Sequence, residues 1–70
     1  MSLILDNRGL EPPQPMMRVM EALETLKENE VLTIINDRKP MFLYEHLEME
    51  GCKHETSENE DGSFTIKIRR

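Results

Sequence analysis

Three side chains of this sequence carry the donor atoms of a transition-metal site: His46, Cys52 and His54. Cys52 and His54 are two positions apart, so in a strand they lie on the same face, and His46 precedes them on a predicted helix. Imidazole and thiolate bind Zn²⁺ and iron, and three such ligands leave one position open. On the helical wheel, however, His46 falls between Phe42 and Leu43, as expected at the edge of a core. We predict no metal and no cofactor, and these three residues are the candidate ligands if a metal binds.

Cys52 is the only cysteine, so no internal disulfide can form. A persulfide carrier needs an accessible thiolate, but Cys52 follows Gly51 at the end of a predicted helix, where the helix dipole disfavours a negative charge. A lone cysteine that enters a strand is typically a small buried hydrophobic residue. We therefore predict no catalytic residue. A sulfurtransferase or persulfide carrier that uses Cys52 is the alternative.

Charged residues gather in two loops that follow predicted parallel strands. Arg8 belongs to the first loop, and Asp37, Arg38, Lys39 and Pro40 form the second, which is the candidate loop site. Ligands of such sheets favour the carboxyl ends of the strands, so Arg8 and Arg38 could bind a small anion. The structural interpretation, which we favour, is that Asp37 caps the second helix and that Arg8 pairs with it.

Composition restricts the class of protein. The chain has 70 residues, of which 37% are hydrophobic and 33% charged, as expected for one globular domain over residues 1–70. The net charge of −5 and the scattered basic residues argue against nucleic-acid binding. No apolar run approaches the ~20 residues of a membrane-spanning helix. We expect no membrane association and a cytoplasmic, bacterial-type location.

Hydrophobic periodicity predicts six elements in the order β-α-β-α-β-β. Residues 3–5 form a short buried strand, residues from Met16 onward form an amphipathic helix that stops near Asn29, and residues 31–35 form a central strand covered on both faces. A second helix runs from Met41 to about Glu50, with Phe42, Leu43 and Leu47 on its apolar side. Strands near 53–57 and 64–69 form a hairpin around Asp61-Gly62, which allows Lys53 and Glu55 to face Arg69 and Lys67. The predicted fold is an α+β two-layer sandwich, with a mixed four-stranded sheet and both helices on one face.

The run from Arg8 to Pro15 resembles a motif of the TusA/SirA sulfur carriers, Gly-Leu-x-Cys-Pro-x-Pro at the start of a helix. Gly9, Leu10, Pro13 and Pro15 match this motif, and Pro12 stands in place of the nucleophilic cysteine. Together with Asn36-Asp37 and Pro40, the run is similar to a sister group of unknown function, some of whose members are joined to haemerythrin-like iron domains. The resemblance implies the same β-α-β-α-β-β fold and a related pathway, and the missing cysteine implies no sulfur transfer at the family site.

We therefore predict a small accessory or protein-interaction domain in a redox, sulfur or metal-related pathway. Its partner is a protein, and the resemblance points to a haemerythrin-like or other redox protein. Methionine offers adaptable apolar contact, and Met17 lies off the apolar stripe of its helix. The candidate interaction surface consists of Arg8, Gly9, Glu11, Pro12, Pro13, Pro15 and Met17. A metal-binding or small-anion-binding domain is the further alternative.

Overall fold

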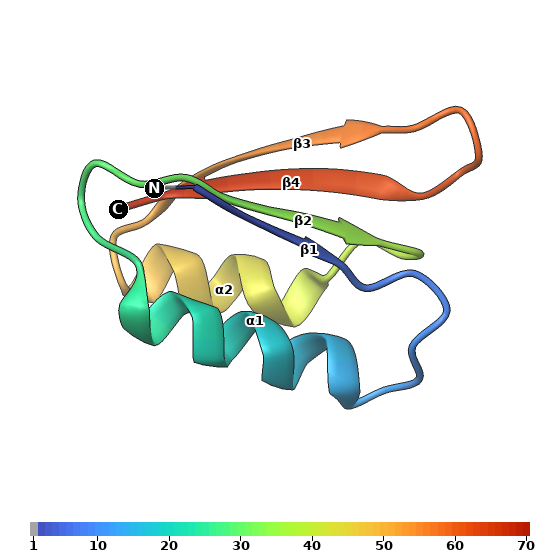
Figure 1. The fold of residues 1–70 in the computed structure, drawn as a ribbon, viewed down its shortest axis with the longest axis horizontal. Helices are drawn as coiled ribbons and strands as arrows, with labels where there is room; N and C mark the ends of the chain where they lie inside the picture. The colour runs from blue at the N-terminus through green and yellow to red at the C-terminus, as the bar shows by residue number, and fades with distance from the viewer. Residues whose placement is uncertain (1) are drawn as a thin grey trace.

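The structure, a computed structural model, describes residues 2–70 and has the predicted order of elements (Figure 1). The strands are β1 (Leu3–Asp6), β2 (Leu32–Asn36), β3 (Lys53–Glu58) and β4 (Phe64–Arg69), and the helices are α1 (Gln14–Thr25) and α2 (Met41–Met49). Both helices begin at the end of the sheet where β1 and β2 finish (Figure 1). The loops after β1 and β2 and the starts of both helices therefore lie at one end of the molecule.

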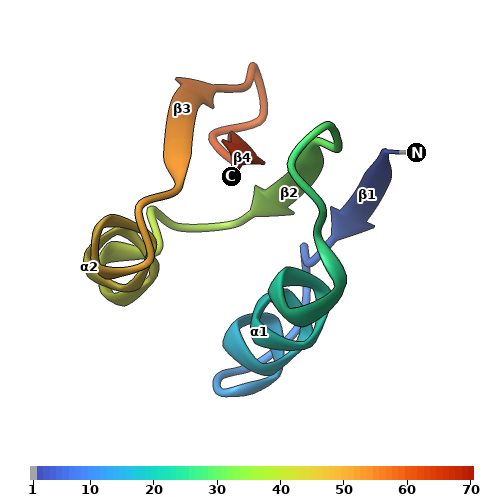
Figure 2. The ribbon, with the colours of Figure 1, turned by 90° about the vertical axis from the view of Figure 1, so that its left-hand side faces the viewer.

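The sheet has the strand order β1-β2-β4-β3. β1 and β2 are parallel, with Leu5 opposite Ile34, whereas β4 is antiparallel to both β2 and β3. Figure 2 shows α1 and α2 on the same side of this sheet. The prediction of an α+β two-layer sandwich with a mixed sheet is confirmed.

The core lies between the sheet and the two helices. β2 and β4 direct alternate residues inward, as period-two strands must, and each helix adds two fully buried residues. Each such side chain stabilises the fold by roughly 1.5–3 kcal/mol relative to its exposed state. The fully buried apolar set is Val19, Leu23, Leu32, Ile34, Leu43, Leu47, Ile66 and Ile68.

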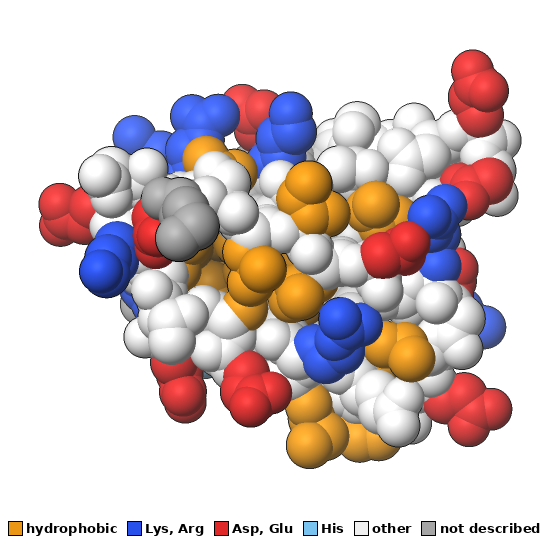
Figure 3. All heavy atoms as spheres, in the orientation of Figure 1, with side chains coloured by type: hydrophobic (Ala, Val, Ile, Leu, Met, Phe, Trp, Pro, Cys, Tyr) orange, Lys and Arg blue, Asp and Glu red, His pale blue; other side chains and the backbone are white. Residues whose placement is uncertain are grey.

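Two predictions about strand burial are wrong. β1 was expected to be buried, but Leu3 and Ile4 are exposed, the latter by 68%. β2 was expected to be covered on both faces, yet Thr33 and Ile35 are only half-buried. The reason is that both helices pack on one face, so within residues 2–70 the other face of the sheet has no covering layer. Figure 3 shows hydrophobic side chains gathered along the β1 side of the molecule.

The ends of the elements differ from the prediction at α1. The helix begins at Gln14, earlier than Met16, because Pro15 in the first turn needs no hydrogen-bond partner for its nitrogen. It ends at Thr25, before Asn29, because Leu26 turns to an extended conformation. Arg70 then donates to the main-chain carbonyls of Leu23 and Leu26, at 2.6 and 2.8 Å.

The second half of the chain follows the prediction closely. α2 ends at Met49, and Gly51 adopts the positive φ of +74° that favours glycine after a helix. In the hairpin Lys53 is opposite Arg69 and Glu55 is opposite Lys67, as predicted. Only the second of these pairs joins opposite charges, so the first does not stabilise the hairpin.

Candidate functional site

The two loops that follow β1 and β2 are tied to each other by hydrogen bonds. The Asn7 N–H donates to the Ile35 carbonyl at 2.8 Å, which extends the parallel pairing by one residue. The Gly9 N–H donates to the Asp37 carboxylate at 2.9 Å. Gly9 has a φ of +80°, a conformation that favours glycine, and this turn brings its N–H to Asp37.

This arrangement corrects the predicted roles of Asp37 and Arg8. Among the described residues no side chain caps α2, because Asp37 bonds to the first loop instead and Pro40 occupies the N-cap position. Arg8 pairs with Asp6 and Asp61 rather than with Asp37. Nevertheless, Asp37 does fix the geometry of the two loops, through a backbone N–H instead of a guanidinium.

Arg8 forms an exposed ion-pair cluster beside these loops. Its Nε and Nη2 donate to the two carboxylate oxygens of Asp6 at 2.9 and 2.7 Å, and its Nη1 donates to Asp61 at 3.1 Å. The side-chain and backbone hydrogen bonds from Arg8 lower the pKa of Asp6 to about 2. Because these groups are exposed, water and salt screen the pairing, and its main effect is to connect the end of β1 to the β3–β4 turn.

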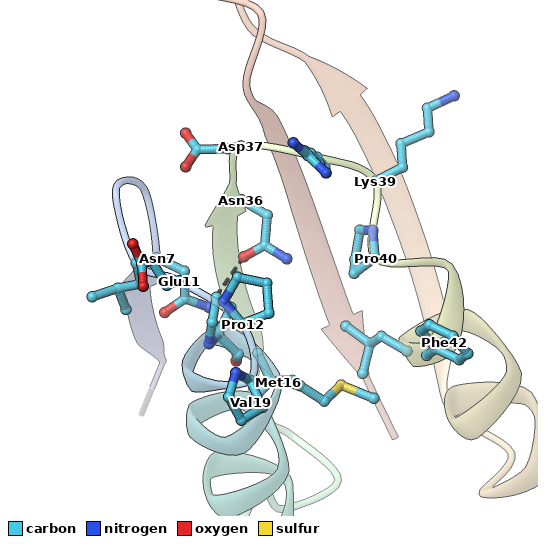
Figure 4. A pocket seen from close by; sticks show the side chains of 15 residues that line it. Asn7, Glu11, Pro12, Met16, Val19, Asn36, Asp37, Lys39, Pro40 and Phe42 are labelled. Atoms are coloured by element: carbon cyan, nitrogen blue, oxygen red, sulfur yellow. Dashed lines mark hydrogen bonds between the residues drawn. The ribbon is translucent and has the colours of Figure 1, made fainter.

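Beneath the loops, a chain of hydrogen bonds runs from the exposed Arg18 to the buried Asn7 and Asn36. Arg18 Nη1 donates to Asn7 Oδ1 at 2.9 Å, and Asn7 Nδ2 donates to Asn36 Oδ1 at 3.1 Å and to the Pro15 carbonyl at 3.4 Å. A guanidinium can only donate, so the Asn7 side-chain atom that faces Arg18 must be the oxygen. The Asn7 amide nitrogen then faces Asn36, so the Asn36 atom that accepts from it must also be the oxygen. The Asn36 amide nitrogen must therefore point away from Asn7 (Figure 4).

A cleft of ≈ 420 Å³ opens between the two loops and the first turns of α1 and α2 (Figure 4). Its walls are mostly apolar, with the two asparagines and four charged residues as the polar groups. A volume of this size and a mostly apolar lining are typical of binding sites for small molecules or side chains. The lining residues are Asn7, Leu10, Glu11, Pro12, Pro13, Pro15, Met16, Val19, Asn36, Asp37, Arg38, Lys39, Pro40, Phe42 and Leu43. We call this site the binding cleft.

The binding cleft unites most of the two regions proposed from the sequence. From the candidate interaction surface it contains Glu11, Pro12, Pro13 and Pro15, and from the candidate loop site it contains all of residues 37–40. Arg8 and Gly9 belong to the loop after β1 but do not line the cleft. Met17 is 61% exposed, as predicted, but does not line the cleft.

Sequence reasoning missed several residues of the binding cleft. Phe42 was predicted to lie on the buried side of α2, but it is 81% exposed at the cleft. Asn7 was not singled out from the sequence, and Asn36 entered only as part of the resemblance, together with Asp37 and Pro40. The signal that could have found them is their equivalent position: each is a polar residue at the carboxyl end of one of two parallel strands, where ligands commonly bind.

The three candidate metal ligands do not share a site, because each side chain has its own surroundings. His46 pairs with Glu50, the ring of His54 stacks on Tyr44 with centroids 4.9 Å apart, and Cys52 is buried. Within residues 2–70 no three His, Cys, Asp or Glu side chains are grouped in a way that could hold a metal ion. Cys52 is 7% exposed, with its sulfur 3.9 Å from Arg70 Nη1, so a partner protein has little access to it.

Fold and site together define a small two-layer α+β domain with an apolar cleft at the carboxyl ends of its parallel strands. Over the described residues, no helix is long and apolar enough to cross a membrane. Residues 4–70 match the model of a family described as "Uncharacterized conserved protein (DUF2249)", and the chain belongs to that family. Neither the curated proteins nor the solved structures contain a match to this chain.

Proposed function

We propose that this chain is a protein-interaction domain that docks a partner through the binding cleft and performs no sulfur transfer there. The observation that carries this proposal is the exposure of Phe42 at the mouth of an apolar cleft. When a partner covers an exposed aromatic ring and a preformed apolar cavity beside it, apolar surface is removed from water, and this stabilises the complex. Large aromatic side chains also dominate the binding energy of protein interfaces.

The opposite wall of the binding cleft favours docking for a second reason. Pro12, Pro13 and Pro15 form this wall, and a proline has little conformational freedom left to lose when a partner binds. Binding to such a preorganised wall therefore costs less entropy than binding to a flexible loop. Met16 lies next to the prolines and can adapt its shape to an apolar segment.

We further infer an evolutionary relationship to the TusA/SirA carriers, supported by the β-α-β-α-β-β order and by the motif from Gly9 to Pro15. In those carriers the nucleophilic cysteine stands where Pro12 stands here. Pro12 lines the binding cleft and has no thiol, so the position would offer a contact surface instead of a nucleophile. The proposed pathway is therefore a cytoplasmic redox, sulfur or metal-related one, and a haemerythrin-like or other redox protein is the proposed partner.

Site-specific photo-crosslinking in the native cell tests the docking proposal. Benzoylphenylalanine is introduced at Phe42 and, as a control, at Met49, which is equally exposed at the other end of α2. We expect a discrete adduct of one protein from position 42 and none from position 49. Phe42→Ser should then abolish co-purification of the crosslinked protein, while Met49→Ser should preserve it. Equal adducts from both positions, or none from position 42, would contradict the proposal.

A further inference from the structure

The side-chain amide of Asn36 presents an unused hydrogen-bond donor to the binding cleft. Asn36 is 8% exposed, and its Oδ1 accepts from Asn7. Its Nδ2 donates to no atom of residues 2–70. Because Arg18 and Asn7 dictate the orientation of the amide, rotating it would place two nitrogens against each other. Figure 4 shows this nitrogen directed away from Asn7, toward the space between Pro40 and Met16. Among the described residues no buried side-chain nitrogen or oxygen lacks a partner, so this nitrogen reaches the surface of the cleft, where the oxygen of a ligand can replace water as its acceptor.

The starts of both helices add positive potential to the same space. α1 and α2 each begin at the binding cleft, and neither has a side-chain cap or an acidic residue in its first turn. The positive ends of two helix dipoles therefore remain without an anionic partner from their own helices.

Two basic side chains at the binding cleft are available to pair with an anion, although two acidic side chains line the cleft as well. Arg38 and Lys39 line it, and neither forms an ion pair within residues 2–70, although Lys39 Nζ lies 5.5 Å from the centroid of the Phe64 ring. Of the two acidic residues that line it, Asp37 accepts a hydrogen bond from Gly9, which leaves Glu11 as the other acid. A ligand with an anionic oxygen would satisfy Asn36 and pair with Arg38.

We propose that the binding cleft captures the free C-terminal carboxylate of a partner protein whose last residue is apolar. This inference rests on the docking function proposed above and specifies the docked segment. The carboxylate would accept from Asn36 Nδ2 and pair with Arg38, and the last side chain would pack against Met16, Pro40 and Phe42, which are the accessible apolar residues nearby. A chain terminus suits the cleft because it carries a carboxylate and an apolar side chain on one Cα atom. The carboxylate of an internal Asp or Glu is instead attached through the one or two methylene groups of its own side chain, so no separate apolar side chain shares its attachment point.

The test is an NMR titration of the full chain with the peptide acetyl-Gly-Ser-Gly-Leu, as the free acid and as the C-terminal amide. The readout is the side-chain NH₂ signal of Asn36 together with the backbone signals of the cleft. We expect the free acid to bind about 10-fold more tightly than the amide, because a charged acceptor roughly doubles the strength of a hydrogen bond. Equal affinity for the two peptides, or no shift of the Asn36 signal, would overturn the proposal.

A matched pair of variants tests the role of Asn36. Asn36→Asp keeps an oxygen that accepts from Asn7 but replaces the donor with an acceptor, so it should abolish the preference for the free acid. Asn29→Asp makes the same change of charge at an exposed position in the loop before β2 and should leave the preference intact. If Asn36→Asp does not fold, Arg38→Ala should weaken binding of the free acid several-fold. The control for Arg38→Ala is Arg69→Ala, at the far end of β4, which should leave binding of the free acid unchanged.

Further outcomes separate this inference from the docking proposal. If 4-methylpentanoate binds as tightly as the peptide, the cleft is a site for small acids and the proposal of a chain terminus falls. Position 42 could crosslink to a partner whose amidated C-terminal peptide binds as well as the free acid. That result would support the docking proposal and refute the capture of a C-terminal carboxylate. If the free acid binds selectively and no partner crosslinks, carboxylate recognition stands and the source in a partner protein is refuted.

Discussion

Replacement of Asn7 by alanine should destabilise this domain more than any exposed substitution in the same region. Asn7 is 1% exposed and makes three side-chain hydrogen bonds, to Asn36, to the Pro15 carbonyl and from Arg18. In Asn7→Ala, the buried Asn36 Oδ1 and the partly buried Pro15 carbonyl lose their donor, and the exposed Arg18 can turn to water. At about 1 kcal/mol or somewhat more for each acceptor, the expected loss is about 2–3 kcal/mol.

A loss of that size is large for a chain of 70 residues, whose whole stability should be about 4–10 kcal/mol. The midpoint of thermal unfolding should fall by about 10–20 °C. Urea denaturation followed by circular dichroism measures the change, and Gln14→Ala, at an exposed position in the first turn of α1, should stay within about 0.5 kcal/mol of the wild type.

The same measurement on a double-mutant cycle tests the chain of hydrogen bonds itself. Asn7→Ala and Asn36→Ala together should cost about 1 kcal/mol less than the sum of the two single changes, because each removes the partner of the other. If Asn7→Ala is as stable as Gln14→Ala, or if the two asparagine changes are additive, then Asn7 does not organise the cleft.

Three other outcomes are expected. Because the folded-state pKa of Asp6 is lowered from 3.8 to about 2, its stabilising contribution is present above about pH 4 and is lost as the pH falls toward 2; NMR titration of the carboxyl in the wild type and in Arg8→Ala checks this, and an unchanged pKa in the variant would disprove the role of Arg8. Cys52 should react with a disulfide reagent only slowly in the native protein and rapidly in urea, whereas equal rates would show that the thiol is accessible. Arg70→Ala should lower stability by about 1–2 kcal/mol, because it removes the donors of the last carbonyls of α1, and a loss no larger than that of Arg69→Ala would argue against this cap.

The secondary structure was predictable because its signals are local. The alternation of Phe64, Ile66 and Ile68 with polar residues requires a strand with one buried face, and the turn at Asp61-Gly62 places a second strand beside it. The ends of α1 were less predictable. Leu26 leaves the helix because it is buried in the core and because Arg70, far away in the sequence, satisfies the helix carbonyls.

The binding cleft was predictable only in part. Proline and charged residues indicated that the loops after the first two strands are the place of interest, since parallel strands bring their carboxyl ends together. The pattern of α2, in contrast, assigned Phe42 to the core. Hydrophobic periodicity identifies the apolar face of a helix, but it does not show how far the sheet extends beneath that face. Because α2 begins at the edge of the sheet, Phe42 in its first turn is not covered.

The order of the elements, the two-layer architecture and the absence of a thiol in the loop follow from residue types and short spacings. Which residues meet in the cleft depends instead on how distant segments of the chain pack together. Asn7 and Asn36 are adjacent because β1 and β2 pair in one particular register, and Arg18 reaches them because α1 packs against that pair. These contacts give the Asn36 amide its direction and make the cleft a site with an open hydrogen-bond donor.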